Sequence, residues 1–171
     1  MTLISLVTGG RTGIGLGIAK ELVKRGQKVY VTSRSECDLT KHGINLINCD
    51  ATTSEGIKHL LKYMAEEKLS VQVLINNIGH TLNIKDPFCE IDEWEKIMSL
   101  NVYSAIRTTN AFGPLMSKLE YGRIINIASN AGIENSGPVT FTTSKAALVA
   151  YTRCIGCVLA TKYPNVVANT V

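Results

Sequence analysis

Short runs of β-branched and aliphatic residues alternate along the chain with longer segments of helical periodicity. Strands that alternate with helices are typical of βαβ units, which build a parallel sheet with helices on both faces. The expected strands are Leu3–Thr8, Lys28–Thr32, Ile44–Asn48, Val71–Ile75, Arg123–Ala128 and Val166–Val171. The expected helices are Gly13–Arg25, Glu55–Lys68, Trp94–Leu119 and Ser144–Tyr163.

Two of the expected helices have marked beginnings. The segment Thr52-Thr53-Ser54-Glu55 has the spacing of a capping box ahead of an apolar run. Asp92 with Glu95 has the same spacing ahead of the third helix. We therefore expect side-chain caps at both places.

Length and composition favour one compact domain. The chain has 171 residues, of which 45% are hydrophobic and 19% charged, so it can bury a core. The net charge of +4 comes from scattered residues, which favours neither a nucleic acid nor a membrane as a partner. No apolar run reaches the roughly 18 residues of a membrane span, and the N-terminus has no positively charged leader. We expect a cytoplasmic protein.

The cysteines and histidines give no clear metal or disulfide pattern. An odd number of cysteines, five, fits a reducing compartment better than a disulfide framework. Cys154 and Cys157 have C-x-x-C spacing inside an apolar stretch, so we interpret them as buried small hydrophobes and expect no metal. The other candidates are Cys37, Cys49, Cys89, His42, His59 and His80, which lack ligand spacing.

The residues that follow the expected strands are polar or glycine-rich. In a parallel sheet these positions share one edge, where ligands bind. The first strand leads into Thr8-Gly9-Gly10-Arg11-Thr12-Gly13-Ile14-Gly15, with a helix beginning at the glycines. Such a turn brings backbone amides and a helix N-terminus to a phosphate. The alternative is a tight strand-to-helix connection without a ligand.

Five features together resemble the classical short-chain dehydrogenase/reductase family. They are the Thr-Gly-x-x-x-Gly-x-Gly turn, the Asn-Asn-x-Gly segment at Asn76–Gly79, and single residues at Asn101, Ser129 and Lys145. The resemblance implies a Rossmann-like, three-layer α/β/α fold with a doubly wound parallel sheet, forming one NAD(P)-binding domain over residues 1–171. It also implies an oxidoreductase that interconverts a carbonyl and a secondary alcohol.

The second strand end bears on the choice of cofactor. It reads Thr32-Ser33-Arg34, without the carboxylate that binds the ribose diol of NAD. Arg34 and Arg11 favour NADP (NADPH) instead, because guanidinium groups pair with a 2′-phosphate; the alternative is that both are solvated surface charges. Asp50 matches an adenine-contacting position of the family or caps the following loop. The expected cofactor-binding residues are Gly9, Arg11, Thr12, Gly13, Ile14, Gly15, Ser33, Arg34, Asp50, Ala51, Asn77, Gly79 and Lys145.

The resemblance assigns catalytic roles to Ser129, Lys145 and Asn101, but the tyrosine that exchanges the proton is missing. Phe141 stands four residues before Lys145, where the family has that tyrosine. A ring without a hydroxyl has no proton to give, so we expect weak or no turnover. Whether Phe141 is natural or introduced stays open, and the alternative is a non-catalytic nucleotide-binding or interaction protein. We interpret Thr142 and Thr143 as helix N-terminal residues that satisfy backbone groups.

The resemblance also bears on the end of the chain and on assembly. The sequence stops at Val171, before the last strand of the family, so we expect a sixth strand at the sheet edge. The family pairs its long helices across a two-fold axis, which predicts a homodimer or homotetramer through residues 94–119 and 144–163. A ketone, a sugar and a 3-oxoacyl chain all stay open as the substrate, as does the direction of the reaction.

Overall fold

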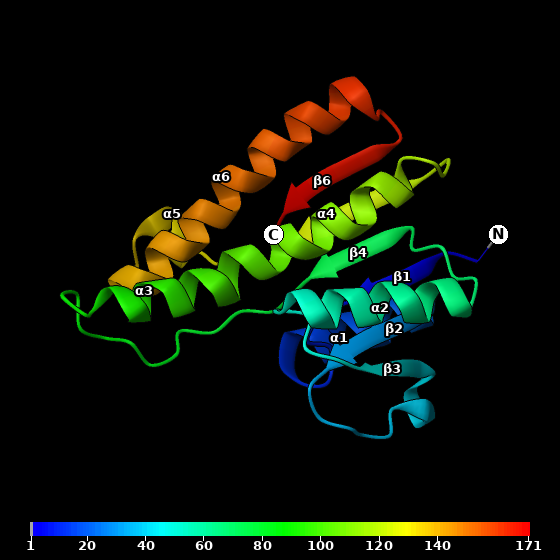
Figure 1. Ribbon diagram of the computed structural model, residues 1–171, viewed down its shortest axis with the longest axis horizontal. Coiled ribbons are helices and arrows are strands. Elements are labelled where there is room, and N and C mark those ends of the chain that lie inside the picture. Colours follow the sequence, from blue (N-terminus) through cyan, green and yellow to red (C-terminus); the bar gives the residue numbers. More distant parts are fainter. Residues whose placement is uncertain (1) are drawn as a thin grey trace.

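The apolar runs pair as parallel strands of a single sheet in the computed structural model, which describes residues 2–171 (Figure 1). The strand order is β3-β2-β1-β4-β5-β6. The register places Val7 of the central strand opposite Val31 on one side and Ile75 on the other. The strands are β1 (Ile4–Val7), β2 (Lys28–Ser33), β3 (Ile44–Asn48), β4 (Val73–Asn76), β5 (Gly122–Asn126) and β6 (Val166–Thr170). The six predicted strands are confirmed, with shifted ends.

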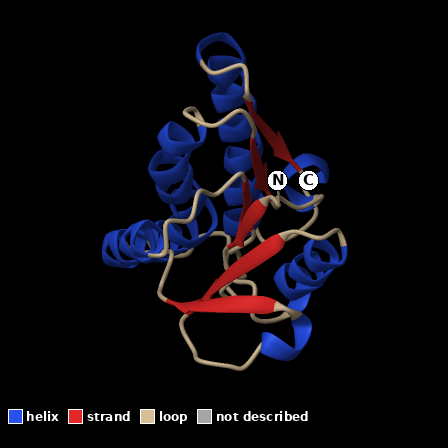
Figure 2. Cartoon of the chain, turned by 90° about the vertical axis from the view of Figure 1, so that its right-hand side faces the viewer, coloured by secondary structure: helices blue, strands red, loops and turns tan. Residues whose placement is uncertain are grey.

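Helices lie on both sides of the sheet (Figure 2). On one face α2 (Ser54–Glu66), α4 (Ser104–Met116) and α6 (Val139–Lys162) pack around a core that includes Leu60, Phe112 and Ile124. On the other face α1 (Gly13–Lys24) packs against the alternate residues of β1 and β2. The predicted doubly wound, Rossmann-like α/β fold is confirmed. No helix within residues 2–171 is both long and apolar enough to cross a bilayer.

A buried polar network fixes α4 and α6 against the middle of the sheet. Asn76 of β4 donates to Asn126 of β5 (2.8 Å) and accepts from Thr108 of α4 (2.6 Å). Asn126 in turn donates to Thr152 of α6 (2.8 Å). All four side chains are buried, so the loss of Thr108 would leave Asn76 Oδ1 in the core without this hydrogen bond.

The prediction of one continuous α-helix over residues 94–119 is wrong. It is divided into α3 (Ile91–Met98), a π-helical segment η2 (Ser99–Tyr103) and α4. A π segment inserts one residue into the turn, and it lies where the Asn101 side chain bonds to the backbone of His80. Because the apolar spacing continues on either side, periodicity alone does not reveal the insertion.

The predicted helix caps need two corrections. The cap of α2 is Thr53, whose hydroxyl accepts from the Gly56 amide (3.0 Å), one residue later than the Thr52–Glu55 spacing suggests. At α3 the predicted cap is wrong, because the helix begins at Ile91 after Glu90 and has no side-chain cap. Asp92 lies in the first turn of α3, where its negative charge interacts favourably with the positive end of the helix dipole.

The last helix begins earlier than the predicted Ser144. It starts at Val139, directly after Pro138, whose fixed φ suits the entry to a helix. Thr142 and Thr143 therefore lie within the helix and not at its cap, and among residues 2–171 the buried Thr142 Oγ1 finds no hydrogen-bond partner. The interpretation of Thr142 as a residue that satisfies a backbone group is wrong.

The prediction that the C-x-x-C cysteines are buried is also wrong. Cys154 and Cys157 do lie in a helix interior, but both are exposed. The helix uses Leu148, Thr152 and Leu159 to face the sheet, which leaves the thiols on the opposite side. The apolar composition of the stretch does not say which side of the helix each residue occupies.

Candidate active site

A cleft of about 950 Å³ lies along the carboxyl ends of the strands. It runs from the turn after β1 to α6, so segments far apart in the sequence meet on one edge of the sheet. All the predicted site residues except Gly15 and Asn101 line it. The lining residues among them are Gly9, Arg11, Thr12, Gly13, Ile14, Ser33, Arg34, Asp50, Ala51, Asn77, Gly79, Ser129, Phe141 and Lys145.

The glycine turn requires its glycines for two different reasons. Gly9 and Gly13 have φ values of +65° and +57°, a backbone conformation that favours glycine. A Cβ on Gly15 would lie 2.5 Å from Asn77 Nδ2 and 2.7 Å from the Gly9 carbonyl oxygen. Gly15 therefore packs beneath the turn instead of lining the cleft. Asn77 locks this arrangement by donating to the carbonyls of Thr8 (3.0 Å) and Gly9 (3.2 Å).

The turn offers what a pyrophosphate needs. The helix α1 begins at Gly13, and the amides of a first helical turn have no partner within the helix. A Cβ on Gly13 would meet nothing within 4 Å, so the turn is open toward the cleft. Arg11 and Arg34 are exposed at the same end, and within residues 2–171 neither forms a salt bridge. These residues fit a dinucleotide phosphate group.

Asp50 has a local structural role as well as a place in the cleft. Its Oδ1 accepts from the backbone amide of Thr52 (2.9 Å) and from the Thr52 hydroxyl (2.7 Å). The loop-capping alternative is therefore correct. The carboxylate still lines the cleft beside Ala51.

Lys145 is buried at the other end of the cleft. Lys145 is only 4% exposed, and its Nζ donates to the Ile127 carbonyl (2.8 Å). Burial disfavours the charged form and lowers the pKa of Lys145 from 10.5 to about 8. The ammonium lies 5.8 Å from the centroid of the Phe141 ring, which carries no oxygen to receive a hydrogen bond.

Asn101 supports this end from below the surface. Its Oδ1 accepts from the His80 amide (2.8 Å), and its Nδ2 donates to the His80 carbonyl (3.1 Å) and to Ser144 Oγ (2.9 Å). Ser144 donates onward to the Phe141 carbonyl (2.7 Å). Asn101 is fully buried and does not line the cleft, so it joins the β4 loop to the first turns of α6.

Ser129 and Gly79 complete the catalytic end. Ser129 follows β5, lines the cleft, and accepts from the Ala131 amide (3.2 Å), which orients its hydroxyl. A Cβ on Gly79 would lie 2.8 Å from Lys145 Nζ and 3.1 Å from Asn101 Oδ1. A side chain at position 79 would therefore press on the Lys145 ammonium and on Asn101 Oδ1.

Several cleft residues are missing from the sequence prediction. The most distinctive is His80, whose Nδ1 accepts from the Leu82 amide (2.8 Å) and so leaves the proton of a neutral ring on Nε2. Most of these residues lie at or shortly after the end of a strand, and that position is the signal that could identify them. The full set is Thr32, Ser35, Cys49, Thr52, Ile78, His80, Leu82, Leu100, Ile127 and Ala128. Within residues 2–171 no three His, Cys, Asp or Glu side chains gather as a metal site.

Residues 4–171 match a family model described as short chain dehydrogenase. The chain belongs to the classical short-chain dehydrogenase/reductase family. It is 33% identical to the 3-oxoacyl-[acyl-carrier-protein] reductase FabG of Vibrio cholerae, over 98% of this chain and 71% of the relative. It is 31% identical to the D-beta-hydroxybutyrate dehydrogenase of Cupriavidus necator, over 98% of this chain and 68% of that protein.

Solved structures share the fold. The aldohexose dehydrogenase AldT of Thermoplasma acidophilum has a TM-score of 0.87 at 27% identity, over 99% of this chain and 65% of that one. The RhlG/NADP active-site complex of Pseudomonas aeruginosa has a TM-score of 0.85 at 30% identity, over 98% of this chain and 69% of that one. This chain thus spans about two thirds of these relatives. Short-chain dehydrogenases are oxidoreductases that interconvert carbonyl and hydroxyl groups with NAD or NADP.

Proposed function

We propose that residues 1–171 form one NAD(P)-binding domain and act as an NADP-dependent oxidoreductase scaffold for a carbonyl and a secondary alcohol, with weak turnover. The observation that carries this proposal is the continuous cleft. It joins an open glycine turn at one end to Ser129, Phe141 and Lys145 at the other. That length suits a dinucleotide whose nicotinamide reaches the catalytic residues.

NADP is favoured over NAD by the charges at the nucleotide end. Arg11 and Arg34 line that end, while Ser33 occupies the place where a carboxylate would bind a ribose diol. Relatives with NADP or NADPH support the choice, namely the RhlG/NADP complex and, at 28% identity, an actinorhodin polyketide ketoreductase with NADPH.

Each residue at the catalytic end has its own role in the reaction. The bound cofactor supplies or accepts a hydride at the carbonyl carbon. The hydroxyl of Ser129 donates a hydrogen bond to the carbonyl oxygen and stabilises the negative charge that builds there. Lys145 would donate to the ribose, and Asn101 ties the loop after β4 to Ser144, the neighbour of Lys145 in α6. Phe141 supplies no proton, and a positioned acid or base typically contributes about 10²–10⁴-fold, so turnover is weak.

Cofactor titration tests the nucleotide assignment. Fluorescence titration should show tighter binding of NADPH than of NADH, and Arg34→Ala should weaken NADPH binding by about 10–150-fold, since a hydrogen bond to a charged group contributes about 1.5–3 kcal/mol. Arg25→Ala is the matched control, because Arg25 lies at the far end of α1 and pairs with Glu21. Equal affinity for the two cofactors, or no loss in Arg34→Ala, contradicts the assignment.

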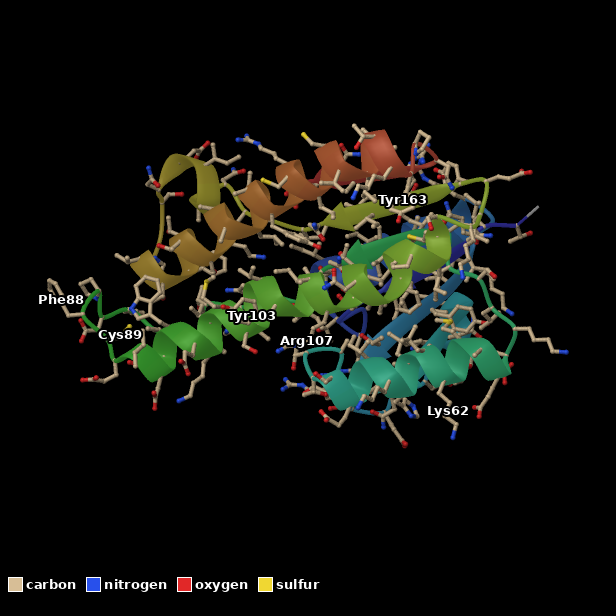
Figure 3. The ribbon with its side chains drawn as sticks, turned by 45° about the horizontal axis from the view of Figure 1, so that its top comes forward. Lys62, Phe88, Cys89, Tyr103, Arg107 and Tyr163 are labelled. Carbon is tan, nitrogen blue, oxygen red and sulfur yellow. The ribbon has the colours of Figure 1, made fainter. Side chains whose placement is uncertain are left out.

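Restoring the phenol tests the catalytic assignment. Phe141→Tyr should raise NADPH oxidation by about 10²–10⁴-fold with some member of a panel of ketones, sugars and 3-oxoacyl thioesters. Phe88→Tyr is the control, because Phe88 is 91% exposed on the loop before α3 and outside the cleft (Figure 3). The panel also identifies the substrate class.

A non-catalytic nucleotide-binding or interaction protein is the second candidate, and Phe141 is the observation that favours it. This candidate predicts that NADPH still binds but that Phe141→Tyr gains no activity with any substrate. Measurable turnover of the unchanged chain, at a rate equal to that of Phe141→Tyr, contradicts both candidates, because another group would then supply the proton.

We also propose a homodimer or homotetramer through α4 and α6. Exposed apolar side chains of these helices include Leu115 (47%) of α4 and Val158 (44%) of α6, and Tyr103 (45%) lies just before α4 at the end of η2. Arg107 of α4 lies beside the Tyr103 ring (Figure 3), and its buried Nη1 has no hydrogen-bond partner in the part of the chain that the structure describes. A second copy would cover this surface. Sedimentation should show a dimer that Leu115→Lys dissociates and Phe88→Lys does not; a monomer at micromolar concentration contradicts the proposal.

A further inference from the structure

Lys145 is a buried amine without an anionic partner at the catalytic end of the cleft. Within residues 2–171 its Nζ makes one hydrogen bond, to the Ile127 carbonyl (2.8 Å), and no carboxylate forms an ion pair with it. The ring of Phe141, whose centroid lies 5.8 Å away, carries no oxygen that could share a proton with the amine. No anionic group of the described chain therefore stabilises the ammonium form.

The neutral form of this amine is accordingly populated near pH 7. Burial lowers the pKa of Lys145 from 10.5 to about 8. At pH 7 about one chain in ten then carries a neutral amine at this position, against about one in three thousand for a lysine with a pKa of 10.5. Only the neutral amine has a free electron pair, so only this form can attack a carbonyl carbon.

The amine is open to the cleft although the residue is buried. Lys145 lines the cleft, and a Cβ on the exposed Gly79 would lie 2.8 Å from Nζ. Because position 79 has no side chain, nothing from this loop residue covers Nζ. A molecule that enters the cleft can therefore reach the amine.

A hydroxyl group lies at the same end of the cleft. Ser129 lines the cleft and comes two residues after Ile127, whose carbonyl holds Nζ. The turn that begins at Ser129 packs against Lys145, because a Cβ on Gly132 would lie 3.0 Å from Lys145 Cβ. The Gly132 amide donates to the Ser129 carbonyl (3.0 Å), which fixes this turn. The catalytic end thus offers both a nucleophile and a hydrogen-bond donor to a carbonyl group.

We propose that Lys145 is also a nucleophile, which forms an imine with a small ketone or aldehyde when no cofactor is bound. The neutral amine attacks the carbonyl carbon, and the carbonyl oxygen takes one amine proton to give a carbinolamine. The oxygen then takes the second amine proton and leaves as water while the C=N bond forms. Ser129 donates a hydrogen bond to this oxygen. No electrons are transferred, and the proposal rests on the proposed function only for the carbonyl class of the ligand.

Acetone is the probe, with sodium cyanoborohydride to reduce each imine to a stable isopropylamine. The whole chain is treated at pH 7 without cofactor, and peptide mass spectrometry measures the rate of labelling at each lysine. Lys145 should be labelled about 10-fold faster or more than Lys58, which is exposed on α2, because far more of its amine is neutral. In guanidinium chloride the two rates should become similar, because unfolding removes the burial that lowers the pKa.

Two glycine variants test whether the ketone reaches the amine from the cleft. Gly79→Ala places a Cβ 2.8 Å from Nζ and should slow the labelling of Lys145 about 10-fold, because the ketone and the amine can no longer align. Gly17→Ala is the matched control, since its Cβ would meet nothing within 4 Å, and it should be labelled like the unchanged chain. The rate at Lys58 should be equal in all three chains. Circular dichroism verifies that each variant is folded.

Two results overturn this proposal. If Lys145 of the folded, unchanged chain is labelled no faster than Lys58, its amine is not a nucleophile of the cleft; this comparison needs no variant. If Lys145 in folded Gly79→Ala is labelled as fast as in the unchanged chain, the ketone does not react from the cleft. Neither result bears on the NADP assignment, because the experiment contains no cofactor and the titration with NADPH tests that assignment separately.

Discussion

The substitution Lys145→Met removes a buried charge and keeps an unbranched side chain of similar length. Lys145 is 4% exposed, and its only hydrogen bond in the described chain goes to the Ile127 carbonyl. No carboxylate offsets the cost of burying the ammonium, and burial alone accounts for the lowered pKa. The free energy of unfolding should therefore depend on pH in a way that the variant lacks.

The sign and size of this dependence follow from the two pKa values. Lys145 releases its proton near pH 8 in the folded chain, but near pH 10.5 in the unfolded one. Between these values the unfolded chain holds one more proton, so the free energy of unfolding rises with pH. Each pH step of one contributes about 1.4 kcal/mol, and the whole rise is about 3 kcal/mol. Below pH 8 the buried ammonium destabilises the fold by a constant amount.

Urea unfolding from about pH 7 to about pH 11 measures this rise. Other groups titrate in the same range, including Cys49 and Tyr151, whose pKa values burial raises. These groups are common to both chains, so the difference between the unchanged chain and Lys145→Met isolates Lys145. Lys118→Met is the exposed control and should follow the unchanged chain. Parallel curves for the unchanged chain and Lys145→Met would refute the reasoning.

Three further predictions concern other parts of the fold. Burial raises the pKa of Cys49 from 9.0 to about 11, so iodoacetamide at neutral pH should alkylate it about 100-fold more slowly in the folded chain than in urea, as peptide mass spectrometry measures. Thr53→Ala should lower the free energy of unfolding by about 1 kcal/mol, because it removes the cap of α2. Gly17→Ala should raise the free energy of unfolding by about 0.5–1 kcal/mol, because a Cβ at this helical position has no atom within 4 Å. Gly56→Ala should lower it, because a Cβ there would lie 1.8 Å from the Asp50 carbonyl oxygen. Urea unfolding measures both changes.

The sheet was predictable because each strand carries its own signal. Buried parallel strands are apolar on both faces, so each reads as a short continuous run bounded by polar residues. Val29, Val31 and Leu74 are buried in such runs. The edge that holds the site follows from the same reasoning, since parallel strands bring their carboxyl ends together.

The features that escaped prediction depend on contacts between distant segments. The π segment lies where Asn101 reaches across to His80, 21 positions earlier in the sequence. Which side of α6 faces outward depends on which of its residues contact β5 and β6. The apolar composition of the stretch does not contain this information, and for that reason it predicted that Cys154 and Cys157 are buried. His80 belongs to no motif in the sequence. Its place beside the other cleft residues is seen only in the folded chain.

The hydrogen bonds around the catalytic end explain why a phenylalanine at position 141 is compatible with this fold. The ammonium of Lys145 is held by Ile127, and the first turns of α6 are tied to the β4 loop through Asn101 and Ser144. The bond from Ser144 reaches position 141 through its backbone carbonyl, so the side chain at this position takes no part in the network. The scaffold of the site and its proton exchange are therefore separable properties of this chain. It follows that Phe141→Tyr should change the free energy of unfolding far less than it changes turnover.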